Sequence, residues 1–176
     1  SNGSNFISEV LPATLGSRSY FGIPNATFRY KNYDNEEFPA KGMLFETKAS
    51  AIDDLGSNTL TGVLDGTLTF HNALLSNKRL VLKTKASTKL LFGDDPKFYQ
   101  FTQLGADTGL RAYRNQRFTG TQSLVGSVDL NYGFQPLKTF LFPLTISVYG
   151  GYDIGRVWID SEDSQVWHDA YGGGFL

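Results

Sequence analysis

The sequence predicts an all-β protein built as an antiparallel up-and-down meander. Apolar and polar residues alternate with a period of two over long stretches, and successive side chains of a strand point to opposite faces. Turn-forming residues separate these stretches, and no segment has a convincing helical stripe. Because the links are short, neighbouring strands are expected to run antiparallel.

The alternation defines each element in turn. In the stretch that starts at Leu60, Leu64 and Phe70 share one face, while Asp65 and His71 share the other. The expected strands cover residues 25–34, 41–53, 60–74, 80–92, 98–105, 123–134, 145–158 and 169–176. The first twenty or so residues are not periodic and are expected to be irregular. We expect residues 1–176 to form one segment with no second domain.

Composition removes several classes of protein. The net charge is -1, which is unlike the basic surplus of a nucleic-acid binder, so no nucleic-acid partner is expected. The absence of cysteine excludes a disulfide scaffold and thiolate zinc sites. The two histidines, His71 and His168, have no metal-ligand spacing. No catalytic motif or cofactor fingerprint is present, so we expect neither an enzyme nor a bound metal or cofactor.

The length of the expected strands bears on whether their apolar face meets lipid or a protein core. Several stretches run for 10–14 residues, whereas ordinary strands average about 5–6 residues and membrane-spanning ones need about 9–11. One face is uncharged and the other carries Asp65, Lys83, Lys85, Lys89, Asp129 and Asp153. Alternation alone fits both a transmembrane barrel, whose apolar face meets lipid, and a soluble barrel or sandwich, whose apolar face meets a core.

The segment Leu110-Arg111-Ala112-Tyr113 interrupts the alternation in a link longer than a hairpin needs. It resembles the Val-Arg-Gly-Phe/Tyr loop signature of the outer-membrane insertases and translocases that include BamA, TamA and FhaC, the bacterial surface-antigen barrels. Three of the four positions match by type. Ala112 stands where that family usually has glycine, which puts the local loop backbone in question.

Three further segments match the same family in order. Tyr152-Asp153-Ile154-Gly155 resembles its aromatic-Asp-x-Gly strand motif, and the run 171–174 resembles the glycine-rich start of the following strand. The run 38–42 resembles its Phe-Pro-x-x-Gly turn. The resemblance implies a part of a sixteen-stranded transmembrane barrel, about eight strands corresponding to the seventh through fourteenth, with the final strands absent. Such a fragment would close with further strands or by self-association with a second copy.

In that family the loop folds back into the lumen and its arginine pairs with carboxylates of the inner wall. Asp153 and Asp129 lie on the polar face, so the resemblance implies that they are the partners of Arg111. The planar guanidinium suits such pairs because it donates two parallel hydrogen bonds to one carboxylate. Leu110, Arg111, Ala112 and Tyr113 are therefore the candidate structural or gating loop, and Tyr152 and Gly155 belong to the strand motif.

The resemblance implies a role in inserting or translocating proteins at the outer membrane of a Gram-negative cell. Outer-membrane lipid and client or accessory proteins would then be the partners. Two alternatives stay open: a barrel that anchors a fused surface hydrolase domain, and a soluble β-barrel or sandwich that binds an apolar ligand. The soluble alternative predicts apolar faces turned inward and lysine faces turned outward.

Overall fold

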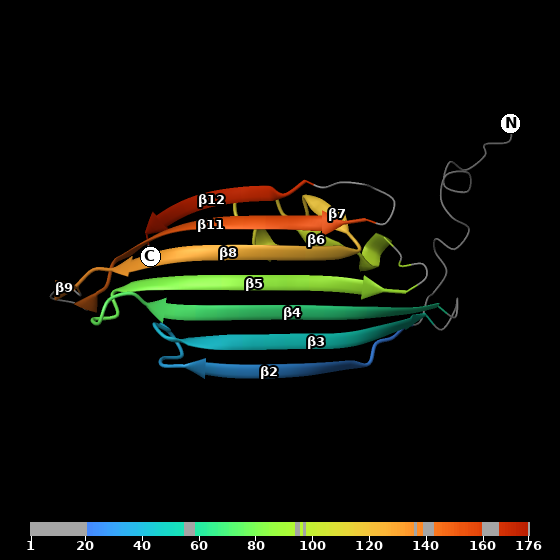
Figure 1. The fold of residues 1–176 in the computed structure, drawn as a ribbon, viewed down its shortest axis with the longest axis horizontal. Helices are drawn as coiled ribbons and strands as arrows, with labels where there is room; N and C mark the ends of the chain where they lie inside the picture. The colour runs from blue at the N-terminus through green and yellow to red at the C-terminus, as the bar shows by residue number, and fades with distance from the viewer. Residues whose placement is uncertain are drawn as a thin grey trace, which may run out of the picture.

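The computed structural model describes residues 21–54, 59–93, 96, 98–135, 137–138, 143–159 and 166–175. They form one long, curved antiparallel sheet of eight strands (Figure 1). The strands of this sheet are β1 (Phe21–Gly22), β2 (Asn25–Tyr33), β3 (Gly42–Asp54), β4 (Thr59–Ala73), β5 (Leu80–Phe92), β8 (Gln122–Gly133), β11 (Ser147–Trp158) and β12 (His168–Phe175). The predicted all-β antiparallel meander is confirmed.

The sheet is open and is not a closed barrel. Its strands follow the order β1-β3-β4-β5-β8-β11-β12, with β2 also paired to β3. The outer edges of β2 and β12 therefore have no strand partner in the part of the chain that the structure describes. That part also contains no helix long and apolar enough to cross a membrane.

One expected strand differs. Within 98–105 only β6 (Thr102–Leu104) is extended, and it follows the short 3-10 helix η1 (Phe98–Gln100). β6 pairs with β7 (Phe118–Gly120) outside the main sheet, while β5 pairs directly with β8. Thr102 and Leu104 are buried beneath the sheet, which explains why their alternation resembles that of a wall strand.

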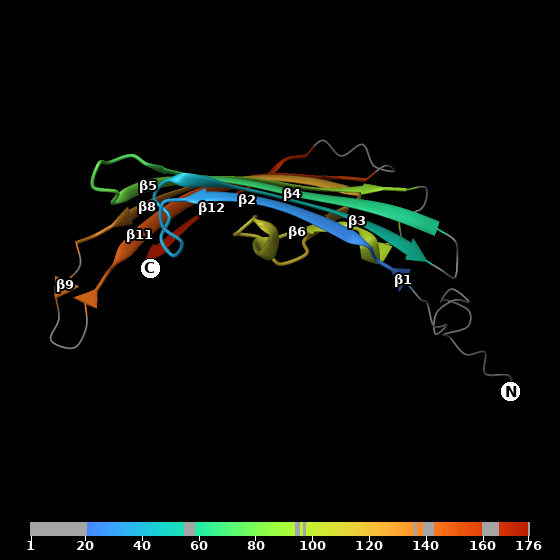
Figure 2. The ribbon, with the colours of Figure 1, turned by 90° about the horizontal axis from the view of Figure 1, so that it is seen from below.

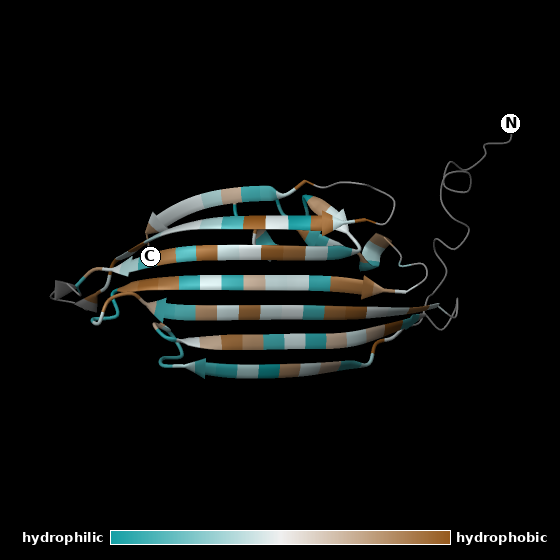
Figure 3. Ribbon diagram, viewed as in Figure 1, coloured by the Kyte–Doolittle hydropathy of each residue, from teal (hydrophilic) through white to brown (hydrophobic). Residues whose placement is uncertain are grey.

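The two faces of the sheet differ in shape and in polarity. Figure 2 shows that the sheet is curved and that β6 and the segment around it lie on its concave side. Hydropathy alternates along most strands (Figure 3), and the register puts residues of one kind side by side. On the concave face, for example, Asp65 lies between Lys48 and Lys89. The concave face thus collects most of the charged residues of the sheet.

The convex face collects large apolar side chains, and these are exposed. Residues in β4 show the contrast, because Leu64 and Phe70 are exposed while Val63 and Thr69, which face the concave side, are buried. The exposed apolar side chains of the convex face include Phe28, Tyr30, Phe45, Leu60, Leu64, Phe70, Leu124, Val128, Leu130, Tyr152, Ile154, Tyr171 and Phe175. This polarity is opposite to that of a soluble barrel with an apolar interior.

The small hydrophobic core lies between the concave face and the segment beneath it. Leu104, Leu110 and Val125 are its buried members, and Tyr113 and Phe118 pack against them. A short hairpin of β9 (Leu137–Lys138) and β10 (Pro143–Leu144) lies in the link from β8 to β11. The rest of the sheet is held by the strand ladders rather than by a buried apolar layer.

Candidate functional site at the Arg111 loop

The segment 105–118, here called the Arg111 loop, forms a tight local structure on the concave side. The 3-10 helix η2 (Ala106–Thr108) begins it, and the Gly105 carbonyl accepts hydrogen bonds from the backbone of Thr108 and Leu110, at 3.1 and 2.9 Å. Gly109 has φ 116°, a conformation that glycine adopts without a steric penalty. The Tyr113 amide donates to the Leu110 carbonyl at 3.0 Å. These bonds fix the turn that presents Arg111.

Arg111 reaches two carboxylates of the concave wall. Its Nε lies 2.6 Å from Asp153 Oδ2 and its Nη2 lies 2.7 Å from Asp153 Oδ1, which makes a two-pronged contact. The Arg111 backbone amide also donates to Asp153 Oδ2, at 3.0 Å. Arg111 Nη2 lies 2.6 Å from Asp129 Oδ1 on the neighbouring strand. The arginine thus ties the loop to β8 and β11 at once.

Burial makes this cluster strong. Asp153 is 1% exposed, and its charge is compensated there by the Arg111 guanidinium, the Arg111 backbone amide and a hydrogen bond from the Ser127 side chain. The hydrogen bond to Asp153 raises the pKa of Arg111, which therefore stays protonated. Charge-assisted contacts of this geometry are about twice as strong as neutral hydrogen bonds.

Glycines of the wall make room for the loop. Gly151 and Gly172 lie in register beside Asp129. A Cβ at Gly151 would collide with Asp129 Oδ1 and Arg111 Nη1, and a Cβ at Gly172 would lie 3.0 Å from Arg111 Cδ. Gly155, two rows further along the same face, would bring a Cβ to 3.2 Å from Leu110 Cδ2. The concave wall therefore has a glycine-lined seat for Leu110 and Arg111.

Leu110 and an aromatic group anchor the loop to the wall at two places. Leu110 is fully buried against Val125 and Leu104. At the other end the rings of Phe118 and His168 stack with centroids 3.7 Å apart. Tyr113 meets both rings edge-on, at 5.1 and 6.0 Å. His168 thus packs against the loop, from the first residue of β12.

The structure places each candidate residue. Leu110, Arg111 and Tyr113 contact the wall, whereas Ala112 is exposed. Ala112 is not among the described residues with positive φ, so this position does not need the glycine that the family signature has. Gly155 lies under Leu110, but Tyr152 is on the convex face, away from the loop.

Sequence reasoning did not identify the seat glycines Gly151 and Gly172 or the ring of His168 as parts of this site. Gly151 could have been predicted as part of the site, because a glycine on the polar face of its strand leaves room for a neighbouring group. His168 carried none, since nothing in its neighbourhood in the sequence relates it to Phe118.

The chemistry of the site is ion pairing and packing. Among the described residues no group of three or more His, Cys, Asp or Glu side chains could hold a metal ion. The arrangement can hold a loop within the curve of the sheet, and loss of its ion pairs would release that loop. No family model and no curated protein matches the chain.

Proposed function

We propose that the chain is a wall segment of a transmembrane β-barrel in the outer membrane of a Gram-negative cell. We further propose that the whole barrel inserts or translocates proteins, with the Arg111 loop as its lumen plug or gate. The convex face would meet lipid and the concave face would line the lumen. Partners would be outer-membrane lipid and client or accessory proteins.

The observation that carries the membrane assignment is the polarity of the sheet. Large apolar side chains are exposed along the convex face, from Phe28 in β2 to Tyr171 in β12. Most charged side chains of the central strands lie on the concave face, as Lys48, Asp65 and Lys89 do. Asp53 and Arg156, both near strand ends, instead share the register rows of the convex residues Leu60 and Leu124. Contact with lipid would remove the apolar surface of the convex face from water, which is favourable by about 25 cal/mol of free energy per Å². In aqueous solution the same surface would stay hydrated.

Strand geometry supports the same proposal. The central strands β3, β4, β5, β8 and β11 have 12 to 15 residues, and about 9–11 residues suffice to cross a bilayer. The free edges of β2 and β12 require strand partners, because lipid cannot satisfy unpaired backbone groups. We therefore propose that this sheet closes with further strands.

The Arg111 loop supports the functional half of the proposal. A loop held by Asp129 and Asp153 lies on the concave side and would narrow a lumen there. The contacts of Arg111 are ionic and hydrogen-bonded, so a client segment of suitable charge could compete for them, while Leu110 keeps its apolar packing. Gating by such competition fits a barrel through which polypeptide passes.

The membrane assignment is tested by folding. Circular dichroism and heat-modifiable gel mobility should reveal compact β-structure only with detergent or lipid vesicles. A cooperative, monomeric fold in plain buffer would contradict it. The role of the loop is tested in the full-length protein, where Arg111→Ala should impair barrel stability and transport and Arg114→Ala, in the same loop, should not. Equal behaviour of the two variants would remove the gating role.

A further inference from the structure

Lysine side chains gather on the concave face beside the Arg111 loop. Away from the strand ends, the charged residues that β2, β3, β4, β5, β8 and β11 carry on this face are Arg29, Lys31, Glu46, Lys48, Asp65, Lys83, Lys85, Lys89, Asp129 and Asp153. Six of them are cations and four are carboxylates, and Arg111 adds a further cation. The concave wall is therefore positively charged, although the whole chain has a net charge of -1.

Most carboxylates of this wall are already paired. Arg29 Nε lies 3.1 Å from Glu46 Oε2, and Arg111 engages both carboxylates of its seat. Among the described residues of the wall, only Asp65 is a carboxylate without an ion pair. Four cations also have no ion-pair partner in the described part of the chain, and they are here called the lysine track: Lys48, Lys83, Lys85 and Lys89.

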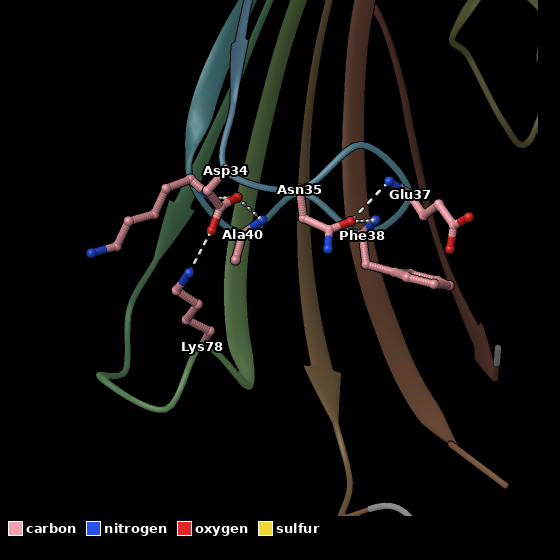
Figure 4. Close-up of polar contacts among 7 residues, drawn as sticks. Asp34, Asn35, Glu37, Phe38, Ala40 and Lys78 are labelled. Carbon is pink, nitrogen blue, oxygen red and sulfur yellow. Dashed lines mark hydrogen bonds and ion pairs between the residues drawn. The ribbon is translucent and has the colours of Figure 1, made fainter. Parts of the chain in front are cut away.

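The turn between β2 and β3, at one end of this wall, does not neutralise the track. Lys78 places its Nζ 2.7 Å from Asp34 Oδ2 (Figure 4). Glu36 pairs with Lys31 at the base of the turn. In Figure 4, Glu37 extends away from Asp34 and Lys78. The acidic side chains of the turn are thus either paired or directed elsewhere.

The lysines are spread along a strand and do not converge on one point. Lys83, Lys85 and Lys89 share one face of β5, so at about 3.4 Å per residue they cover about 20 Å. A small anion could contact only one or two of them. An extended peptide places alternate side chains about 7 Å apart on one face. Acidic side chains at every second residue could therefore meet Lys83 and Lys85 together.

The track is sheltered and has room beside it. Its three lysines on β5 are half-buried, and a charge pair is stronger there than in bulk water. A hollow of about 360 Å³ lies between the wall and β6, and its lining includes Lys89, Thr67 and Ser87. The two hydroxyl groups can donate hydrogen bonds to a carboxylate beside the lysine. Asp65 lines the same hollow and lies in register between Lys48 and Lys89, so two ammonium groups share one carboxylate there.

The surroundings of the track favour a polypeptide as its occupant. Lipid is proposed to cover the convex face, whereas the track lies on the concave one. Proteins that bind single-stranded nucleic acid stack its bases on aromatic rings. The residues in register beside the track include no Phe, Tyr or Trp, since they are Thr27, Asp65, Thr69, His71, Ser123, Ser127 and Asp129.

We propose that the lysine track binds an acidic, extended segment of a polypeptide. The inference rests on the proposed function and deepens it, because it assigns a charge class to the client that passes along the concave face. An acidic segment on Lys83 would lie beside Asp129, which is its neighbour in register, and would compete there for Arg111. The track would thus direct the client to the ion pairs that hold the loop.

The first test compares two probes on the full chain folded in a neutral detergent. One dye-labelled peptide alternates glutamate with threonine, and the other alternates lysine with threonine. Fluorescence anisotropy should show that the chain binds the glutamate peptide about tenfold more tightly. The net charge of -1 would not produce this preference. Equal affinity for the two peptides, or tighter binding of an oligothymidylate than of the glutamate peptide, would overturn the proposal.

The second test locates the binding on the track. Lys83→Gln combined with Lys85→Gln should weaken binding of the glutamate peptide about tenfold. The matched control combines Lys41→Gln with Lys78→Gln, which removes the same charge from exposed positions in the turns, and should change the Kd less than about twofold. Lys83→Arg combined with Lys85→Arg keeps the charge and should bind as the parent chain does. Equal Kd values for the glutamine variant and the control would contradict the proposal.

The two proposals can fail separately, because heat-modifiable mobility reports folding and anisotropy reports the charge that is bound. A chain that folds only with detergent or lipid but binds both peptides alike contradicts the acidic client alone. A chain that folds in plain buffer and still prefers the glutamate peptide contradicts the membrane assignment and supports the acidic ligand.

Discussion

Replacing Arg111 by alanine should release the loop and destabilise the whole sheet. The change removes two side-chain hydrogen bonds to Asp153 and the ion pair with Asp129. It leaves Asp153, 1% exposed, with the backbone amide of residue 111 as its remaining donor from the loop. Breaking one partner out of a buried ion pair costs about 3–5 kcal/mol. We expect a loss of that size in the free energy of unfolding.

The assay is urea unfolding of the chain folded in detergent micelles, followed by tryptophan fluorescence, with limited proteolysis of the loop in parallel. Arg114→Ala is the control, because Arg114 is exposed in the same loop. Arg111→Lys should recover only part of the loss, since an ammonium cannot reproduce the two-pronged contact. The reasoning is refuted if Arg111→Ala and Arg114→Ala unfold at the same urea concentration and are cleaved at the same rate.

Three further predictions concern the packing of the loop and the turn. Gly151→Ala should lower the free energy of unfolding by about 1–3 kcal/mol, because its Cβ would overpack the seat of Arg111. Gly150→Ala should be near neutral in the same assay, because a Cβ there would meet nothing within 4 Å. Leu110→Ala should cost about 2–5 kcal/mol because Leu110 is 0% exposed; a loss under 1 kcal/mol would mean that the loop does not depend on this anchor. The hydrogen bond to Lys78 lowers the pKa of Asp34, in the turn between β2 and β3, so the contribution of Asp34 to stability should be complete above about pH 4, where an unfolded aspartate titrates. It should decline as the pH falls below that value and vanish only when the native carboxylate is protonated in stronger acid; loss of hydrogen-exchange protection at Ala40 above about pH 4 would contradict this.

Alternation predicted most of the sheet, because polar and apolar residues alternate along most of the length of most strands. The stretch from Leu60 to Phe70 became β4 with its faces as expected. The stretch 98–105 misled for a physical reason: Thr102 and Leu104 are buried under the sheet, so they show a strand period without belonging to the wall. Alternation of apolar and polar residues indicates that one side of a segment is buried, but it does not indicate which element covers that side.

The central contact of the site was predicted from the resemblance of the loop to a family signature, together with the polar-face positions of Asp129 and Asp153. Both carboxylates do contact Arg111. The stacking of His168 on Phe118 depends on the path of the chain through a long loop, which local sequence does not encode. The run 38–42 was expected to be a turn, but the hydrogen bond from Lys78 to Asp34 beside it joins residues 44 positions apart.

The membrane assignment is tested most directly by spin labels on single cysteines along β4, which is possible because the chain has no cysteine of its own. Labels at 64, 68 and 70 probe the convex face, and labels at 63, 65 and 67 probe the concave face. In lipid vesicles, we predict that oxygen, which concentrates in lipid, accelerates the spin relaxation of the labels on the convex face. A water-soluble nickel complex should accelerate the relaxation of the labels on the concave face, except where the loop shields them. Nickel access to positions 64, 68 and 70, with no preference for oxygen, would mean that water covers the convex face, and the transmembrane assignment would be wrong.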